Sequence, residues 1–193
     1  MIKIINTVKR IIIFFRLFCF FHIVYAQNYN VDSLKKVLNT NIADSTRIEI
    51  LSQIGLLYLN TNLDSSMMYI SQFNQVPSRS KKMEARGLNL MGDIYLRTGN
   101  ASKALELLLK SLKIEETLQD PFGISMLYWN LGKVYQSQND NAKAIEYFLK
   151  VLKMSPIDQL GEPRCFAMGR LGLLYMEINH LDTALYYTQS SYQ

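Results

Sequence analysis

The apolar positions of this chain recur with the period of α-helices. After Asn100, apolar residues follow in pairs along one helical face, and charged residues occupy the opposite face. This spacing indicates an amphipathic helix that buries one side. The apolar positions are Ala104, Leu105, Leu108, Leu109 and Leu112, and the charged ones are Lys103, Glu106, Lys110 and Lys113. No convincing strand alternation occurs after Ala26, so the pattern predicts an all-α chain.

Polar residues mark several predicted helix starts. Asn100 and Asn141 stand just before amphipathic runs, where an N-cap residue belongs. Thr46 and Glu49 have the spacing of a capping box. These residues predict where three of the helices begin.

Prolines and an early apolar cluster mark further helices. Pro121 and Pro163 are expected in first turns, where the missing N–H of proline is harmless. Residues 32–39 are expected to form a short helix. Its inward side is predicted to consist of Val31, Leu34, Val37 and Leu38.

A motif consisting of an apolar residue, a glycine, two variable residues and a tyrosine occurs four times. Its glycines stand at positions 55, 92, 132 and 172, so the motif recurs with a nearly constant period. Self-similarity at a period of roughly 20–50 residues indicates a stacked repeat array. The four copies are Ile54-Gly55-x-x-Tyr58, Met91-Gly92-x-x-Tyr95, Leu131-Gly132-x-x-Tyr135 and Leu171-Gly172-x-x-Tyr175.

From about residue 44 onward, these motifs resemble the tetratricopeptide repeat. The resemblance implies an all-α superhelical solenoid of stacked antiparallel helix pairs. In each pair a glycine and a facing alanine would let two helix axes approach closely. Glycine inside a helix costs roughly 1 kcal/mol relative to alanine, so four in one register favour a packing role. The residues that define the repeat are Gly55, Tyr58, Gly92, Tyr95, Ala104, Gly132, Tyr135, Ala144, Pro156, Gly172, Tyr175 and Ala184.

The predicted organisation is a leader, a short helical segment and about four repeat units. Residues 27–43 would precede the array. In the first unit the turn is one residue shorter, and Ser66 takes the place of the alanine. The units are expected at 44–77, 78–120, 121–160 and 161–193, with the last incomplete.

Residues 1–26 have the layout of a secretory signal peptide. Lys3, Lys9 and Arg10 precede an apolar run over residues 11–25, and Ala26 stands at the expected cleavage site. The run is short for a membrane span, which needs about 20 apolar residues. The alternative is an uncleaved anchor over residues 11–25. A secreted or periplasmic location is expected, with membrane attachment through this run or a downstream segment as the variant.

Charge and chemistry argue against two function classes. The chain has 21 basic and 16 acidic residues, but four of the basic ones lie before Gln27, which leaves a net charge of +1 after it. Nucleic-acid binding is therefore not expected. His180 in a turn and Cys165 are read as structural, and the Glu115-Glu116 pair is read as solvated surface. No phosphate loop, nucleophile elbow or metal-ligand spacing occurs, so no enzyme activity, cofactor or metal is expected in this segment.

The resemblance implies a concave groove, lined by the first helix of each unit, that holds a peptide or protein segment. Chaperone-binding members of this family hold the C-terminal carboxylate of a peptide with lysine and asparagine side chains. That arrangement is not reproduced here, because Asp93 has the wrong charge and Leu90 replaces an amide. Trp129 is interpreted either as a groove contact or as packing between repeats. The groove positions carried over from the family are Glu49, Ser52, Arg86, Asn89, Asp93, Arg97, Met126, Trp129, Lys133, Ser137, Phe166 and Leu173.

A leader followed by long repeats also resembles the extracytoplasmic N-terminal region of bacterial sensor histidine kinases and helix-turn-helix regulators. This resemblance implies a non-catalytic sensing part, with an output domain after Gln193. The alternative is a stand-alone envelope adaptor or assembly protein without signalling output.

Overall fold

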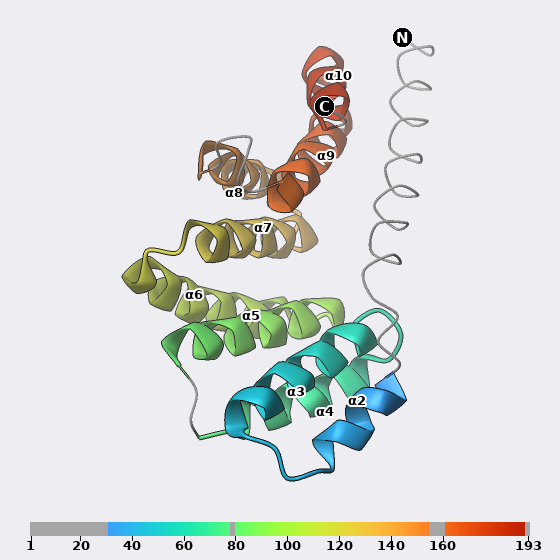
Figure 1. Ribbon diagram of the computed structural model, residues 1–193. Helices are drawn as coiled ribbons and strands as arrows, with labels where there is room; N and C mark the ends of the chain where they lie inside the picture. Colours follow the sequence, from blue (N-terminus) through green and yellow to red (C-terminus); the bar gives the residue numbers. More distant parts are fainter. Residues whose placement is uncertain (1–30, 78–79, 155–160, 192–193) are drawn as a thin grey trace. The chain divides into compact units, whose positions relative to one another are not determined.

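The computed structural model describes residues 31–77, 80–154 and 161–191. Every regular element within these ranges is an α-helix, so the predicted all-α fold of helix pairs is confirmed (Figure 1). The expected signal peptide and Pro156 lie outside the described residues.

The chain divides into two compact units, and the division falls inside α7 (Pro121–Ser137), after Asn130. The N-terminal unit contains the start of α7 and five complete helices. These are α2 (Val31–Leu38), α3 (Asp44–Tyr58), α4 (Leu63–Gln75), α5 (Lys81–Arg97) and α6 (Ala101–Leu118). The C-terminal unit contains the end of α7 and α8 (Asn141–Met154), α9 (Gly161–Glu177) and α10 (Leu181–Ser190).

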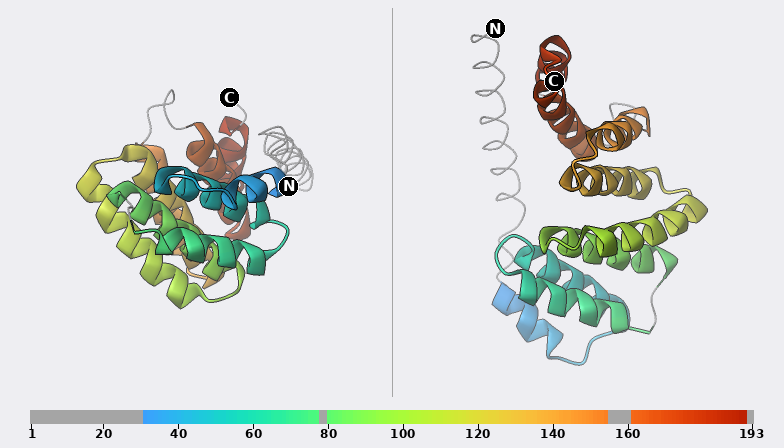
Figure 2. Two further views of the ribbon diagram at one scale, coloured as in Figure 1. Left: turned by 60° about the horizontal axis from the view of Figure 1, so that its bottom comes forward. Right: turned by 180° about the vertical axis from the view of Figure 1, so that it is seen from behind.

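Antiparallel helix pairs build the N-terminal unit. Helix α3 packs along α4 and α5 packs along α6, while α4 contacts α5 and α2 contacts α3 (Figure 2). The first core cluster is centred on Leu51, Ile54 and Phe73, which are almost fully buried. Leu34 of α2 belongs to the same cluster. Val37 is 43% exposed, so its predicted inward position is wrong: the eight-residue helix turns too narrow a face toward α3.

The C-terminal unit repeats the same packing. Helix α9 packs along α10, and α8 contacts α9. Phe148 and Val151 of α8 are fully buried, as are Leu171 and Leu174 of α9. The apolar stripes of these amphipathic helices are therefore buried between the helices of this unit.

The repeated glycines lie where the two helices of a pair cross. A Cβ atom on Gly132 would lie 2.5 Å from Phe148 Cε1, and one on Gly92 would lie 2.8 Å from Leu108 Cδ2. The neighbouring alanines Ala104, Ala144 and Ala184 are fully buried. In the first pair, Ser66 is fully buried at this position and its Oγ donates to the Gly55 carbonyl oxygen over 2.7 Å.

Three turns within helix pairs share a left-handed residue. Gly99 has φ 83°, and Asn139 and Asn179 each have φ 61°. Glycine and asparagine adopt this region at the lowest cost. The turn between α3 and α4 has no such residue; it spans residues 59–62 and is one residue longer than the other three turns, because α3 already ends at Tyr58.

Helix starts follow the predicted cap chemistry only in part. Asn100 caps α6, because its side chain accepts from Lys103 N over 3.0 Å. For α8 the cap is Asp140, one residue before the predicted Asn141, and it accepts from Lys143 N over 3.1 Å. The predicted capping box is wrong: α3 begins at Asp44, so Thr46 already lies inside the helix.

The prolines lie in first turns. Pro121 is the first residue of α7, and Pro163 is the third residue of α9. Both helices therefore begin at or just before a residue whose backbone needs no hydrogen-bond acceptor.

Candidate functional site

A network of polar side chains connects α3, α5 and α7 within the N-terminal unit. Arg86 Nη1 lies 3.5 Å from Glu49 Oε2, which joins α5 to α3. Asn130 Nδ2 donates to Asn89 Oδ1 over 2.6 Å, which joins α7 to α5. We call these groups, together with those around Arg97 described next, the first-helix network. Its members are Glu49, Asn60, Arg86, Asn89, Asp93, Arg97 and Asn130.

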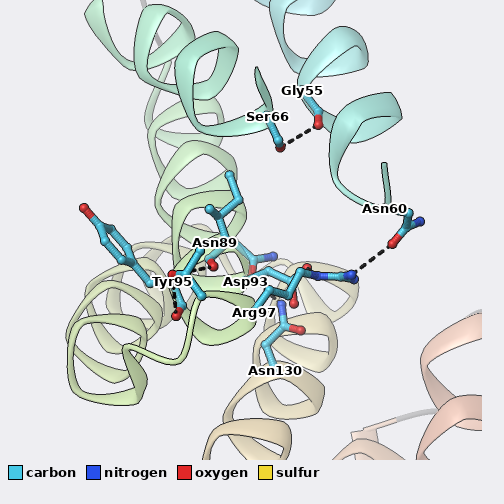
Figure 3. A network of polar contacts seen from close by, with 10 residues as sticks. Gly55, Asn60, Ser66, Asn89, Asp93, Tyr95, Arg97 and Asn130 are labelled. Carbon is cyan, nitrogen blue, oxygen red and sulfur yellow. Dashed lines mark hydrogen bonds and ion pairs between the residues drawn. The ribbon is translucent and has the colours of Figure 1, made fainter. Parts of the chain in front are cut away.

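Arg97 is held between an acid of its own helix and an amide of the preceding turn. Its Nε donates to Asp93 Oδ2 over 2.9 Å, and its Nη1 donates to Asn60 Oδ1 over 2.9 Å (Figure 3). Asp93 is 7% exposed, and the guanidinium compensates its charge. The Arg97 side chain itself is 38% exposed. Only two of the five guanidinium N–H donors are used in these two bonds.

A hollow of about 440 Å³ adjoins Arg97. Residues 59–62 of the turn between α3 and α4, with Leu63 at the start of α4, form the rest of its lining. The hollow thus combines a partly exposed guanidinium with amide and hydroxyl groups from the turn. Such groups bind carboxylates, because guanidinium N–H donors match carboxylate oxygens in geometry and charge.

The predicted groove residues of α5 all contribute to this network. Arg86, Asn89 and Asp93 lie along α5 together with Arg97. Their side chains range from partly exposed at Arg86 to nearly buried at Asp93, whose carboxylate is bound by Arg97. Asp93 therefore orients the guanidinium rather than presenting its own charge.

The other groove positions differ in exposure. Met126 and Trp129 on α7 are half-buried, as are Lys133 and Phe166 in the C-terminal unit. Ser52 is fully buried, and its Oγ has no hydrogen-bond partner in the described structure. The groove position carried over to Ser52 is therefore wrong, because this stretch of α3 faces the core.

Sequence reasoning missed two members of the network. Asn60 lies in the turn after α3, and Asn130 lies one residue before the repeated Leu131-Gly132 motif. Asn60 belongs to no repeat motif, and Asn130 precedes its motif at a position that varies between the copies. Their roles depend on which side chain of the neighbouring helix pair faces them, and no local signal in the sequence encodes that contact.

The predicted solvated position of Glu115 is also wrong. Glu115 is only 6% exposed, and its Oε2 has no hydrogen-bond partner in the described structure. It lies on the side of α6 that faces α7, where Gly123 leaves room for it. Burial raises the pKa of this carboxyl, and the charge of Asp120 raises it further, while Lys82 opposes the shift. Lys82 Nζ lies 2.7 Å from Asp120 Oδ2.

The remaining candidate residues from the sequence are Cys165 and His180. Cys165 is half-buried. His180 is the N-cap residue of α10, and its ring makes an edge contact with Tyr175 at a centroid distance of 6.3 Å. Across residues 31–191, excluding the undescribed gaps, no group of three or more His, Cys, Asp or Glu side chains could hold a metal ion. None of the described helices has the length and apolar character required to cross a membrane.

Relatives cover parts of this chain. It is 30% identical over 81 residues to the Photosystem I assembly protein Ycf3 of Acaryochloris marina, which is 42% of this chain and 47% of that protein. It is 21% identical over 159 residues to the UDP-N-acetylglucosamine–peptide N-acetylglucosaminyltransferase of Giardia intestinalis, which is 78% of this chain and 10% of that protein. The chain thus spans half or less of the length of these relatives.

Solved structures share the fold. A signal transduction ATPase with a tetratricopeptide repeat sensor from Pyrococcus horikoshii matches with a TM-score of 0.67 and 18% identity, over 83% of this chain and 25% of that one. MamA matches with a TM-score of 0.55 and 22% identity, over 83% of this chain and 84% of that one. The family model of the tetratricopeptide repeat matches residues 83–156 of this chain. The described helices share the fold of the solved structure that contains a tetratricopeptide repeat sensor.

Proposed function

We propose that this chain is a non-catalytic scaffold that binds a peptide or protein segment through the first-helix network. The observation that carries the proposal is Arg97, which is fixed by Asp93 and Asn60 and faces a hollow of about 440 Å³. A charged group held by two partners loses little conformational entropy when a ligand binds. The expected ligand feature is therefore an acidic side chain, or a terminal carboxylate, of the bound segment.

The test uses a displayed library of random twelve-residue peptides and the full chain. Selected peptides are expected to be enriched in Asp and Glu. Their affinity should fall at least tenfold in the double variant Asp93→Asn/Arg97→Gln, which removes the guanidinium without leaving a buried charge unpaired. Lys113→Gln on exposed α6 is the matched loss of one positive charge and should leave binding unchanged. Equal affinity of the double variant and the wild type would contradict the proposal.

We further propose that the scaffold lies outside the cytoplasm and forms the sensing part of a signalling protein. The leader layout of residues 1–26 supports the location, and the resemblance to sensor N-termini supports the role. A reporter enzyme that needs disulfide bonds, fused after Gln193, should be active in cells, and deletion of residues 1–26 should abolish its activity. Full reporter activity without the leader would overturn the location.

The second candidate is an assembly or adaptor role without signalling. It is favoured by the similarity to Ycf3, whose name describes an assembly protein. The size of the native protein in cell fractions separates the two candidates. A membrane-bound product much larger than 22.3 kDa supports the sensor, whereas a product close to this mass supports the adaptor.

A further inference from the structure

In three of the helix pairs, a tyrosine of the first helix stacks on a tyrosine of the second helix. Tyr58 stacks on Tyr69 with a centroid distance of 5.9 Å and an interplanar angle of 11°. In the C-terminal unit, Tyr135 stacks on Tyr147 at 5.3 Å, and Tyr175 stacks on Tyr187 at 5.6 Å. In each pair the first ring belongs to the repeat motif and the second comes from the following helix. Such pairs add to stability beyond the area they bury.

The α5–α6 pair lacks the second ring. Tyr95 occupies the motif position, but Leu107 stands at the place in α6 that Tyr147 takes in α8. Tyr95 has no stacked aromatic partner among the described residues. A hollow of about 320 Å³ opens beside it. Its lining is mostly apolar and includes Leu88, Met91, Tyr95 and Leu107, together with Glu84 and Lys103.

This hollow is separate from the first-helix network. Figure 3 shows Tyr95 projecting from α5 away from Arg97 and Asn60. The hollow lies between α5 and the start of α6, and Asn74 of α4 also lines it. A ligand here would leave Arg97 accessible.

The charged residues of the hollow take part in ion pairs on their own helices. On α6, Lys103 and Lys110 share Glu106, with Nζ to oxygen distances of 2.8 and 2.6 Å. On α5, Lys81 pairs with Glu84 over 2.9 Å. Of these charged residues only Glu84 and Lys103 line the hollow, so its lining has one charge of each sign and no excess.

We propose that the hollow beside Tyr95 is a second docking site, which takes one aromatic side chain of a partner peptide. The partner's ring would stack on Tyr95 and supply the ring that Leu107 does not. Its chemistry follows from the chain itself, which fills the equivalent place with an aromatic ring in each of the other three pairs.

The test uses a small probe, N-acetyl-Phe-Asp-amide, and methyl NMR signals of the full chain. The probe should shift the signals of Leu88, Met91 and Leu107 in a saturable way. N-acetyl-Leu-Asp-amide, which has no ring, should shift them at least tenfold more weakly at equal concentration. Equal shifts with both probes, or no saturable shift with the aromatic one, would overturn the proposal.

Two variants test the site: one places an aromatic ring of the chain in the hollow, and the other removes the Tyr95 ring on which the partner's ring would stack. Leu107→Tyr restores the pair seen in the other helix pairs, and it should weaken probe binding at least tenfold while the helical circular dichroism is kept. Leu109→Tyr adds the same ring at a position of α6 that is 44% exposed and outside the hollow, and it should leave binding unchanged. Tyr95→Leu is the second variant, and it should also weaken binding at least tenfold. Unchanged binding in a folded Leu107→Tyr or Tyr95→Leu variant would refute the site.

Discussion

The carboxyl group of Glu115 occupies the space that a side chain at residue 123 would need. A Cβ atom on Gly123 would lie 2.5 Å from Glu115 Cδ and 2.7 Å from its Oε2. The contact joins α6 to the first turn of α7, where Asp120 accepts from the N–H groups of Phe122 and Gly123. A buried carboxyl oxygen without a partner is costly, since an unsatisfied polar group loses its hydration.

Glu115→Gln should therefore stabilise the protein at pH 7, by about 1 kcal/mol, because the neutral amide is less costly to bury. The pKa of Glu115 is raised from its ordinary value of 4.5, so the folded state holds the proton more tightly than the unfolded chain. The unfolding free energy should then fall as the pH rises from about 4.5 through the raised pKa. Urea unfolding between pH 4 and 8 measures both effects. Glu116→Gln, at the exposed neighbour, is the control; a Glu115→Gln variant less stable than the wild type at pH 7 would contradict this account.

Gly132→Ala should destabilise the protein although alanine favours helices by roughly 1 kcal/mol. The added methyl group would meet the buried Phe148 ring at 2.5 Å, and overpacking of this kind costs typically about 1–3 kcal/mol. Gly132→Leu should destabilise the protein more than Gly132→Ala and should loosen the array. Thermal melting followed by circular dichroism measures both variants. Ser102→Ala, at an exposed position of α6, gains propensity without a clash and should not lower the melting temperature.

Ser66→Ala should cost about 1 kcal/mol, even though alanine is the residue found at this position in the other helix pairs. The Ser66 hydroxyl is fully buried and donates to the Gly55 carbonyl oxygen, and its removal leaves that bond unmade. The urea midpoint gives the change in stability. Ser65→Ala, on the more exposed side of the same turn of α4, should change it by less. Equal effects of the two substitutions would show that the buried bond adds nothing.

Ala43→Ser should stabilise α3. Ala43 holds the N-cap position with φ −61° and ψ 149°, an extended conformation that suits a capping residue, and no side chain accepts from the first turn. A serine hydroxyl there is expected to add about 0.5–1 kcal/mol. The melting temperature should rise. The same exchange at Ala142, an exposed position in the first turn of α8 that Asp140 already caps, should give no gain.

The repeat was predictable because its signals are local and periodic. Gly55, Gly92, Gly132 and Gly172 occur in one register, and helix crossings with no room for a side chain explain them. The burial of Glu115 was not predictable, because two adjacent glutamates read as solvated surface until the rotation of α6 is known. The bond between Arg97 and Asn60 joins two helix pairs across a long stretch of sequence, so it depends on packing that no local pattern encodes. The start of α3 was missed because Thr46 and Glu49 have the spacing of a capping box although both lie inside the helix.

Each helix crossing is filled by a different side chain. The glycine faces Ile70 in the first pair, Leu108 in the second, Phe148 in the third and Thr188 in the fourth. A helix transplanted from one pair to another would face a crossing side chain of the wrong size. The result would be either a void or a steric clash at the crossing. Recombination between the copies would therefore succeed only when a glycine and its facing side chain move together. The crossing, and not the single helix, is the unit in which such an array can be duplicated or shuffled.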